Sequence, residues 1–324
     1  MIRTRFTEMF GVEKPIVQGG MHWIGVPEFA SVVCNNGGIG TINRAIYADP
    51  KSFDDALEEM ESLTSKPYFV NISLTRDLMT NNDINKYIDI CINHHVAGIE
   101  FAAGNPKDYI EKVKKGGIRL IHKSPNAHVS QSMARKGADV ITIAGYEVAG
   151  HPSMDGIGTF VIANRVASLV DVPVLAAGGV ADGKGLAAAL ALGCEGAVMG
   201  TRLVATDECP VSDNHKNWVI EHTEKDTVIT QKSIGSANRV ANNMAAKLTL
   251  EMEKRGTTIE ELMDVISGKR GKVAYETGDV DGAIFALGPA MGLVHEIKPV
   301  GDVLNEMVEE AESIVKRLNG QIME

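Results

Sequence analysis

The sequence predicts an α/β fold: a (β/α)8 TIM barrel with a small helical second domain near the C-terminal rim. Eight short apolar runs follow one another along the chain at intervals of about 20 to 30 residues, which fits a strand, a helix and two loops. The runs are continuously apolar, as expected of strands buried on both faces of a parallel sheet. The last two runs end in glycine, at Gly178-Gly179 and at Gly200.

The predicted strands, in chain order, are Ile16-Val17, Gly38–Ile42, Tyr68–Ile72, Gly98–Ala102, Ile118–Ile121, Val140–Ile143, Val174–Ala177 and Ala197–Met199. The segments between them carry helical patterns. A cap and a proline, Asp49 and Pro50, precede apolar residues at helical spacing up to Met60. Val129–Lys136 has a similar pattern, and Lys184–Gly193 is rich in alanine and leucine.

The competing architecture is an open doubly wound sheet, which would place a glycine-rich phosphate loop after its first strand. Gly19-Gly20-Met21 follows the first predicted strand, but no G-x-G-x-x-G pattern continues from it into a helix. Residues 36–40 precede and enter the second strand, so their glycines are interpreted as a helix stop. The sequence therefore favours the barrel.

The composition is that of an ordinary globular protein, with 44% apolar and 23% charged residues. A net charge of −10 without any basic run argues against nucleic acid or an anionic membrane as partner. The four cysteines form no C-x-x-C pair, and three lie in or beside predicted barrel elements, where we expect them to be buried. No apolar stretch suits a signal peptide or a membrane span, so we expect a cytoplasmic protein.

Three regions are expected. Residues 1–205 form the barrel. Residues 206–285 are polar, with helices expected over Ser236–Glu253 and Thr258–Ser267, and form a helical lid beside the C-terminal rim. Residues 286–324 contain a glycine-spaced run and an amphipathic helix, Val303–Leu318, that can return to cover the barrel wall.

Active sites of TIM barrels lie at the C-terminal ends of the strands, and polar residues occur there. They are Gln18 and His22 after the first strand, Asn71 in the third, His122 and Lys123 in the fifth, and Glu147 and His151 after the sixth. The chain has no G-x-S-x-G elbow and no H-E-x-x-H spacing, so neither a serine nucleophile nor a metal site is predicted. His151 follows Ala149-Gly150 on a loop that faces the expected pocket, which makes it the main candidate for acid–base chemistry.

The glycine-ended loops after the seventh and eighth strands present bare backbone N–H groups, which suit a phosphate. A phosphate there, with the Asn71 amide and the Lys123 ammonium, is compatible with flavin mononucleotide (FMN) lying across the barrel mouth. Asn71 would bond the pyrimidine edge of the flavin, and Lys123 would face N1 and the C2 carbonyl, where reduced flavin carries charge. A sugar phosphate would also fit the cradle, so the topology alone leaves both ligands open.

The chain resembles the nitronate monooxygenase (2-nitropropane dioxygenase) family, which includes FMN-dependent enoyl-acyl-carrier-protein reductases and NAD(P)H:quinone reductases. The order and spacing of several motifs along nearly the whole chain carry this resemblance. The motifs are Pro15–Met21, Asn35–Gly40, Lys66–Ile72, Ile121–Lys123, Ala149–Pro152, Ala176–Gly183, Met199–Arg202 and Gly278–Asp281. The chain departs from the family pattern at Ser124-Pro125-Asn126 and at Gly288-Pro289, two places that could line a substrate pocket.

The resemblance implies an FMN barrel with His151 as the acid or base near flavin N5. Cofactor contacts are expected from Gln18, Gly19, Gly20, Met21, Asn71, Lys123, Gly150, Gly178, Gly179, Gly200 and Thr201. His22, His122 and Pro289 are expected to line the substrate pocket, although a structural role is the simpler interpretation of the two histidines. The partners expected are a small-molecule substrate and, as one option, a second copy of the chain.

The leading expectation for the reaction is FMN-dependent oxidation of alkyl nitronates with oxygen. The alternative is a NAD(P)H-dependent flavin reductase acting on an enoyl thioester or a quinone, or a dehydrogenase running that step backward. A histidine, with an ordinary pKa of about 6.5, can give or take a proton near neutrality in each case. A third alternative, from a different class, is a non-redox phosphate-binding barrel such as an isomerase or lyase.

Overall fold

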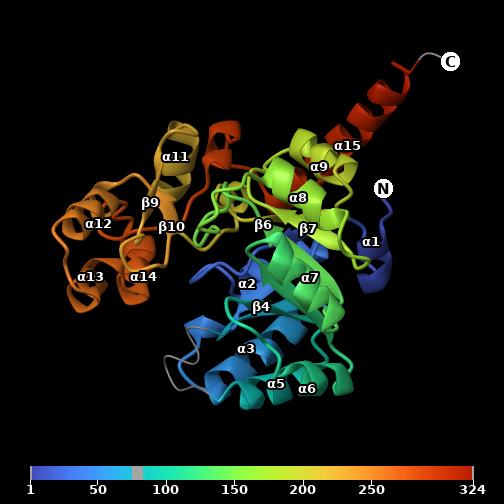
Figure 1. Cartoon of the computed structure of the whole chain (residues 1–324), viewed down its shortest axis with the longest axis horizontal. Coiled ribbons are helices and arrows are strands. Elements are labelled where there is room, and N and C mark those ends of the chain that lie inside the picture. Colours follow the sequence, from blue (N-terminus) through green and yellow to red (C-terminus); the bar gives the residue numbers. More distant parts are fainter. Residues whose placement is uncertain (1, 75–82, 323–324) are drawn as a thin grey trace.

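A computed structural model describes residues 2–74 and 83–322 and confirms the predicted barrel. Its eight parallel strands hydrogen-bond in the order β1-β8-β7-β6-β5-β4-β3-β2, and helices surround them (Figure 1). The strands are β1 (Ile16–Gln18), β2 (Thr41–Asn43), β3 (Phe69–Ser73), β4 (Gly98–Ala102), β5 (Arg119–Ser124), β6 (Val140–Ala144), β7 (Val174–Ala177) and β8 (Gly196–Met199). Every predicted strand overlaps an observed one, and the largest differences are at β2, which begins at Thr41 rather than Gly38, and at β5, which ends at Ser124 rather than Ile121.

The ring of strands closes between β1 and β2 through few backbone contacts. Val17 and Ile39 form a single parallel bridge. Beyond this bridge, the side chain of Gln18 supplies the hydrogen bonds between the two strands. Its Nε2 donates to the Thr41 carbonyl at 3.2 Å, and its Oε1 accepts from the Thr41 N–H at 3.4 Å. A side-chain amide carries the donor and acceptor of a peptide group, so Gln18 extends the seam between the two strands.

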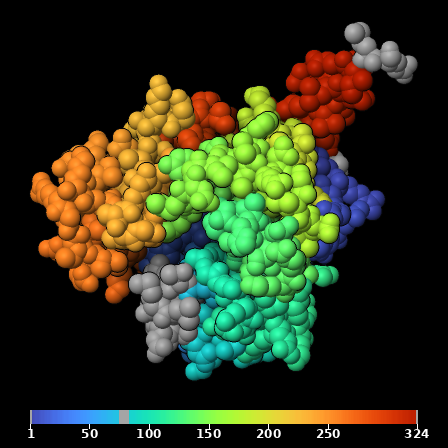
Figure 2. Space-filling model, in the orientation of Figure 1, coloured from blue at the N-terminus to red at the C-terminus, as the bar shows by residue number. Residues whose placement is uncertain are grey.

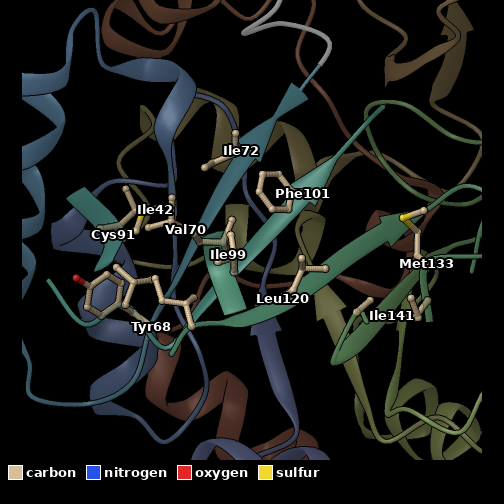
Figure 3. Close-up of a cluster of buried hydrophobic side chains, with 14 of the residues drawn as sticks. Ile42, Tyr68, Val70, Ile72, Cys91, Ile99, Phe101, Leu120, Met133 and Ile141 are labelled. Atoms are coloured by element: carbon tan, nitrogen blue, oxygen red, sulfur yellow. The ribbon is translucent and has the colours of Figure 1, made fainter. Parts of the chain in front are cut away.

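Helices surround the strands on the outside and at the ends of the barrel. They are α1 (Arg5–Phe10), α2 (Pro27–Asn35), η1 (Arg44–Ile46), α3 (Pro50–Leu63), α5 (Ile84–Asn93), α6 (Ile110–Lys115), α7 (Ala127–Arg135), α8 (Thr159–Ala167), α9 (Gly183–Ala191) and α10 (Thr201–Val204). α3 begins as its sequence predicts, with Pro50 in its first turn and the Asp49 side chain accepting from a backbone N–H. Figure 3 shows Ile72, Phe101 and Leu120 on successive strands of the apolar cluster beneath these helices.

The inner face of the strands fills the barrel with apolar side chains, among them Phe69, Ile121 and Leu175. Helix α1 adds aromatic rings to this core: the Phe10 ring lies edge-on to that of Phe69, with centroids 4.8 Å apart. Since side chains alternate along a strand, the residues two positions after these core residues also point inward. They lie one layer nearer to the C-terminal mouth, where Asn71 and Lys123 are polar and Ala177 continues the apolar core.

Residues 206–285, called the lid below, lie beside the barrel (orange in Figure 1). Their elements are α11 (Asp213–Glu221), β9 (Thr227–Thr230), β10 (Asn238–Ala241), α12 (Met244–Lys254), α13 (Ile259–Ile266) and α14 (Gly268–Thr277). The predicted helix over Ser236–Glu253 is wrong in its first part, because β10 pairs with β9 in an antiparallel hairpin. The β-branched residues of β9 favour this pairing, and the Asn243 side chain starts α12 by accepting from the Ala246 N–H.

The Gly278–Asp281 motif forms a turn that holds the lid together. Asn243 Nδ2 donates to the carbonyls of Val280 and Ala283 at 2.6 and 2.7 Å. Asp281 in turn accepts from the Met244 N–H at 2.8 Å, at the first residue of α12. These contacts give the motif a structural role in the lid.

The chain returns from the lid to the barrel through η2 (Pro289–Leu293) and α15 (Val300–Asn319). α15 packs against α9 and α2, on the outside of the barrel. All four cysteines are buried and none forms a disulfide. Within the described ranges, no helix is both long enough and apolar enough to cross a lipid bilayer.

Candidate active site

Four polar side chains line the mouth of the barrel from inside. They are Asn71 of β3, Glu100 of β4, Lys123 of β5 and Thr142 of β6, and each stands two positions after an inward-facing residue. Asn71 Nδ2 donates to Glu100 Oε2 at 2.7 Å, and both side chains are buried. Lys123 is the register partner of Thr142, whose buried hydroxyl has no hydrogen-bond partner among the described residues.

The loops after β7 and β8 form the predicted glycine cradle. Gly178 and Gly179 have φ values of +98° and +81°, in the left-handed region that favours glycine. A Cβ on Gly178 would lie 2.6 Å from the Val148 nitrogen, so this loop packs directly on the loop after β6. Within the part of the chain that the structure describes, no acceptor bonds the amides of Gly178, Gly179, Gly200 or Thr201.

The loop after β1 runs between these two groups. A Cβ on Gly20 would lie 2.4 Å from the Cβ of Asn71, and a Cβ on Gly200 would lie 3.4 Å from the Met21 sulfur. The backbone from Gly19 to Met21 therefore joins the Asn71 side of the mouth to the glycine cradle. Thr201 closes the other side, where its hydroxyl accepts from the Gly288 N–H at 2.9 Å.

His151 follows the sixth strand, directly after Gly150, whose φ of +76° turns the chain. Figure 2 shows a hollow between the lid and the segment after β6. The His151 side chain is exposed to solvent at the mouth. Desolvation from the surrounding loops, and next the positive charge of Lys123, lower the pKa of His151 below its ordinary value. Lys123 therefore lies near enough for its charge to act on His151, and a pKa below the ordinary value favours the neutral form of the ring at neutral pH.

Two of the predicted site residues are turned away from the mouth. Gln18 is fully buried, and both ends of its amide bond the backbone of β2. His122 lies on the opposite face of β5 from Lys123, where its Nδ1 is 2.8 Å from the Ser124 hydroxyl. Burial lowers the pKa of His122 to about 4. The side chains of Gln18 and His122 therefore do not line the barrel mouth.

The other two predicted pocket residues lie at the border between barrel and lid. The His22 ring packs against Trp23, with centroids 4.7 Å apart, and Trp23 Nε1 donates to the Gly268 carbonyl of the lid at 2.6 Å. Pro289 opens η2 directly after Gly288 and is half-buried. Both residues are close enough to the lid to line a pocket beneath it.

Sequence reasoning missed three polar residues here. Glu100 interrupts an otherwise apolar strand, which was a usable signal, and Thr142 does the same in β6. Arg239 gave none, because it lies in a segment predicted to be helical. In the structure it is buried in β10 and contacts the loop that carries His151.

The chain was compared with known proteins. The family model described as nitronate monooxygenase matches residues 3–310. A dehydrogenase of Rhodococcus jostii strain RHA1, named for its (3aS,4S,5R,7aS)-5-hydroxy-7a-methyl-1-oxo-octahydro-1H-indene-4-carboxyl-CoA substrate, is 35% identical over 241 residues. That alignment covers 74% of this chain and 66% of the relative. A probable nitronate monooxygenase of Staphylococcus aureus strain JH9 is 28% identical over 280 residues, covering 74% of this chain and 79% of the relative.

Among solved structures, FabK from Thermotoga maritima superposes with a TM-score of 0.92 at 34% sequence identity, covering 99% of this chain and 100% of FabK. The family model thus spans nearly the whole chain, and the relatives similar in sequence and in structure are consistent with it. The chain therefore belongs to the nitronate monooxygenase family of oxidoreductases.

Proposed function

We propose that this protein is an FMN-dependent oxidoreductase in which neutral His151 removes a proton from a carbon beside an electron-withdrawing group. The substrate in this proposal is a nitroalkane, whose α-proton His151 removes, or the alkyl nitronate that results, which needs no base before its oxidation. The observation that carries the proposal is the position of His151 on the loop after β6, within reach of the charge of Lys123 in the barrel mouth, which together with desolvation lowers the pKa of the imidazole. A base with a lowered pKa stays in its proton-accepting form at neutral pH.

The residues at the mouth fit FMN. Amides of the glycine cradle lack partners among the described residues, and Gly178 and Gly179 hold the left-handed backbone that presents them. Gly178, Gly179, Gly200 and Thr201 would hold the phosphate, with Met21, Asn71 and Lys123 toward the ring. FMN, when bound, supplies electron transfer: it takes electrons from the substrate and passes them to oxygen or another acceptor.

The chain's own groups then have distinct tasks. His151 Nδ1 or Nε2 takes the proton from the α-carbon of a nitroalkane. The Lys123 ammonium stabilises negative charge that develops at the mouth, because a fixed cation in a partly desolvated site needs no reorganisation. Glu100 orients Asn71. Because the Asn71 Nδ2 donates a hydrogen bond to the Glu100 carboxylate, the Asn71 amide oxygen remains to accept from a ligand N–H.

One comparison favours a second candidate, dehydrogenation of an acyl thioester. The relative from Rhodococcus jostii is named a carboxyl-CoA dehydrogenase and is 35% identical. A thioester carbonyl acidifies its α-carbon as a nitro group does, so His151 would perform the same proton removal. The difference between the two candidates lies in the rest of the substrate.

Purified flavin-loaded protein distinguishes these candidates. Oxygen uptake with nitroethane or its nitronate is expected for the leading proposal. Anaerobic bleaching of the flavin by butanoyl-CoA would transfer the proposal to the second candidate. Bleaching by NADH or NADPH, with turnover of an enoyl thioester or a quinone, would replace both by a reductase. Protein that cannot be loaded with flavin would overturn the proposal as a whole.

Replacing Lys123 with methionine is expected to raise the pKa of His151, because the substitution removes a repelling positive charge. The acidic limb of the pH–rate profile should therefore move to higher pH. The bound flavin should also become harder to reduce, by about 1–3 kcal/mol for one partly buried charge-assisted contact. Redox titration and pH–rate profiles measure the two effects, and Lys123→Arg, which keeps the charge, is the control. An unchanged profile and potential in Lys123→Met would show that Lys123 acts only as a rim charge.

A further inference from the structure

The loop that carries His151 is bonded to the lid through strand β10. The Gly150 N–H donates to the Arg239 carbonyl at 3.0 Å, and the Arg239 N–H donates to the Gly150 carbonyl at 2.6 Å. β10 is already paired with β9, so Gly150 adds an edge to the lid hairpin. These two bonds fix the residue directly before His151.

The side chain of Arg239 fixes the other end of the same loop. Its Nε and Nη2 donate to the Tyr146 carbonyl at 3.1 and 2.9 Å, and its Nη1 donates to Thr227 Oγ1 at 3.2 Å. The guanidinium carbon also lies 4.8 Å from the centroid of the Tyr146 ring. Arg239 is only 9% exposed, so this contact is desolvated and its planar fork is held in place.

His151 depends on this arrangement because its own ring is not anchored. The His151 ring makes no hydrogen bond to any described residue, and its backbone belongs to neither a helix nor a strand. The first part of the loop is held to the barrel side: the Val148 N–H donates to the Gly145 carbonyl at 3.1 Å, the Tyr146 N–H to the Ile157 carbonyl at 2.8 Å, and the Glu147 carboxylate accepts from Thr159 at 2.7 and 2.9 Å. From Ala149 onward the contacts with Arg239 hold the loop to the lid, so the direction of the imidazole depends on both sets of contacts.

We propose that Arg239 is a positioning residue of this enzyme: from the lid, it holds the loop 146–150 so that His151 faces the mouth beside Lys123. The inference rests on the proposed role of His151 as the base. It makes the docking of the lid hairpin a condition for an assembled active site, although no lid residue need touch the substrate. A displacement of about 1 Å of a catalytic group is sufficient to cost 10²-fold in rate.

The test compares Arg239→Met and Arg239→Lys with a matched control. Arg270 is another lid arginine that donates to two backbone carbonyls, those of Gly282 and Asp264, both at 2.8 Å and both within the lid. Arg270→Met thus removes a similar pair of bonds without touching the His151 loop. All variants are studied as flavin-loaded protein, with the flavin content measured first.

The first readout is hydrogen exchange of the amides of Tyr146, Val148 and Gly150, which does not require a known substrate. We expect both Arg239 variants to exchange faster in this segment, on the order of tenfold, because a charge-assisted contact is lost or loses its fork. Arg270→Met should leave the segment unchanged. Equal protection of residues 146–151 in the parent and in both Arg239 variants would overturn the inference.

The second readout is the titration of His151 by NMR, assigned with His151→Asn. A freed loop should let the pKa of His151 rise toward its ordinary value, and turnover should fall by about 10- to 100-fold with flavin retained. Arg239→Lys separates position from charge: it keeps a cation but cannot form the fork, so a parent-like titration in this variant would contradict the positioning role. If Arg239→Met does not fold, Thr227→Val, which removes the acceptor of Nη1, provides a milder change of the same contact.

The two proposals fail in different ways. A fully active His151→Asn would overturn the proposed function. Hydrogen exchange would then still test, by itself, whether Arg239 holds the loop 146–150. An inactive His151→Asn together with unchanged exchange and titration in the Arg239 variants would keep the proposed function and overturn the positioning role.

Discussion

Replacing His151 with asparagine is expected to leave flavin bound and to lower turnover of a nitroalkane by about 10² to 10⁴, the usual contribution of a general base. The residue follows β6 on the loop facing the mouth, away from the glycine cradle, so its loss should not release the cofactor. In the parent protein, activity should fall as the pH drops through the lowered pKa of His151, because the protonated ring cannot accept a proton. Steady-state rates over a range of pH measure both effects.

Two comparisons make this result specific. The loss should shrink when a pre-formed nitronate replaces the neutral nitroalkane, since the proton has already been removed. His128→Asn, at an exposed position of α7, is the control and should behave as the parent. Parent-like turnover in His151→Asn would reject the catalytic assignment, and a variant that purifies without flavin would show that His151 is structural.

Gly179→Val is expected to produce protein without flavin. Gly179 has a φ of +81°, which a β-branched residue adopts only with strain of about 1–2 kcal/mol. A Cβ there would lie 3.7 Å from the Cβ of Glu147, an ordinary contact, so the added side chain does not clash with the barrel itself. The loss should come from the cradle: the loop shifts its free amides, and the valine methyl groups occupy the space that a phosphate needs. The visible absorbance of the purified variant measures the occupancy.

Gly117→Val is a matched control for the backbone strain. Gly117 has a φ of +76° with nothing within 4 Å of its Cβ position, and it lies in the turn before β5, at the opposite end of the barrel. Both variants should lose similar thermal stability, and only Gly179→Val should lose flavin. Full occupancy in Gly179→Val would move the phosphate to another site.

The barrel was predictable because each strand is a compact apolar run with a glycine or a cap beside it. The same property hides which face of a strand points inward, since a run that is apolar on both faces has no alternation to read. His122 and Lys123 are neighbours in the sequence, so their side chains point to opposite faces of β5. Only the structure, in which Lys123 pairs with Thr142 of β6, shows that Lys123 faces the mouth and His122 faces away from it. The side chain of Gln18 likewise points away from the mouth, to the backbone of Thr41.

Contacts between distant segments were beyond local patterns. The Asn71–Glu100 pair and the Arg239–Tyr146 contact join residues that are 29 and 93 positions apart. The sequence around one residue of such a pair gives no indication of which distant residue it contacts. The lid hairpin was missed because β9 and β10 are short and become strands mainly by pairing with each other and with Gly150, a tertiary effect that outweighs helical propensity.

The slight seam between β1 and β2 governs the order in which a newly made chain can fold. Ile16 of β1 pairs with Ala197 of β8, so the first strand has no full partner until almost the whole barrel has been synthesised. β2 to β7 can pair one after another as they emerge, which leaves a curved open sheet with free edges at β2 and at β7. Ring closure is then the last and slowest event, because it joins the most distant parts of the barrel. Until Met199 has been added, the unpaired edge strands of the growing chain are open to association with other nascent chains.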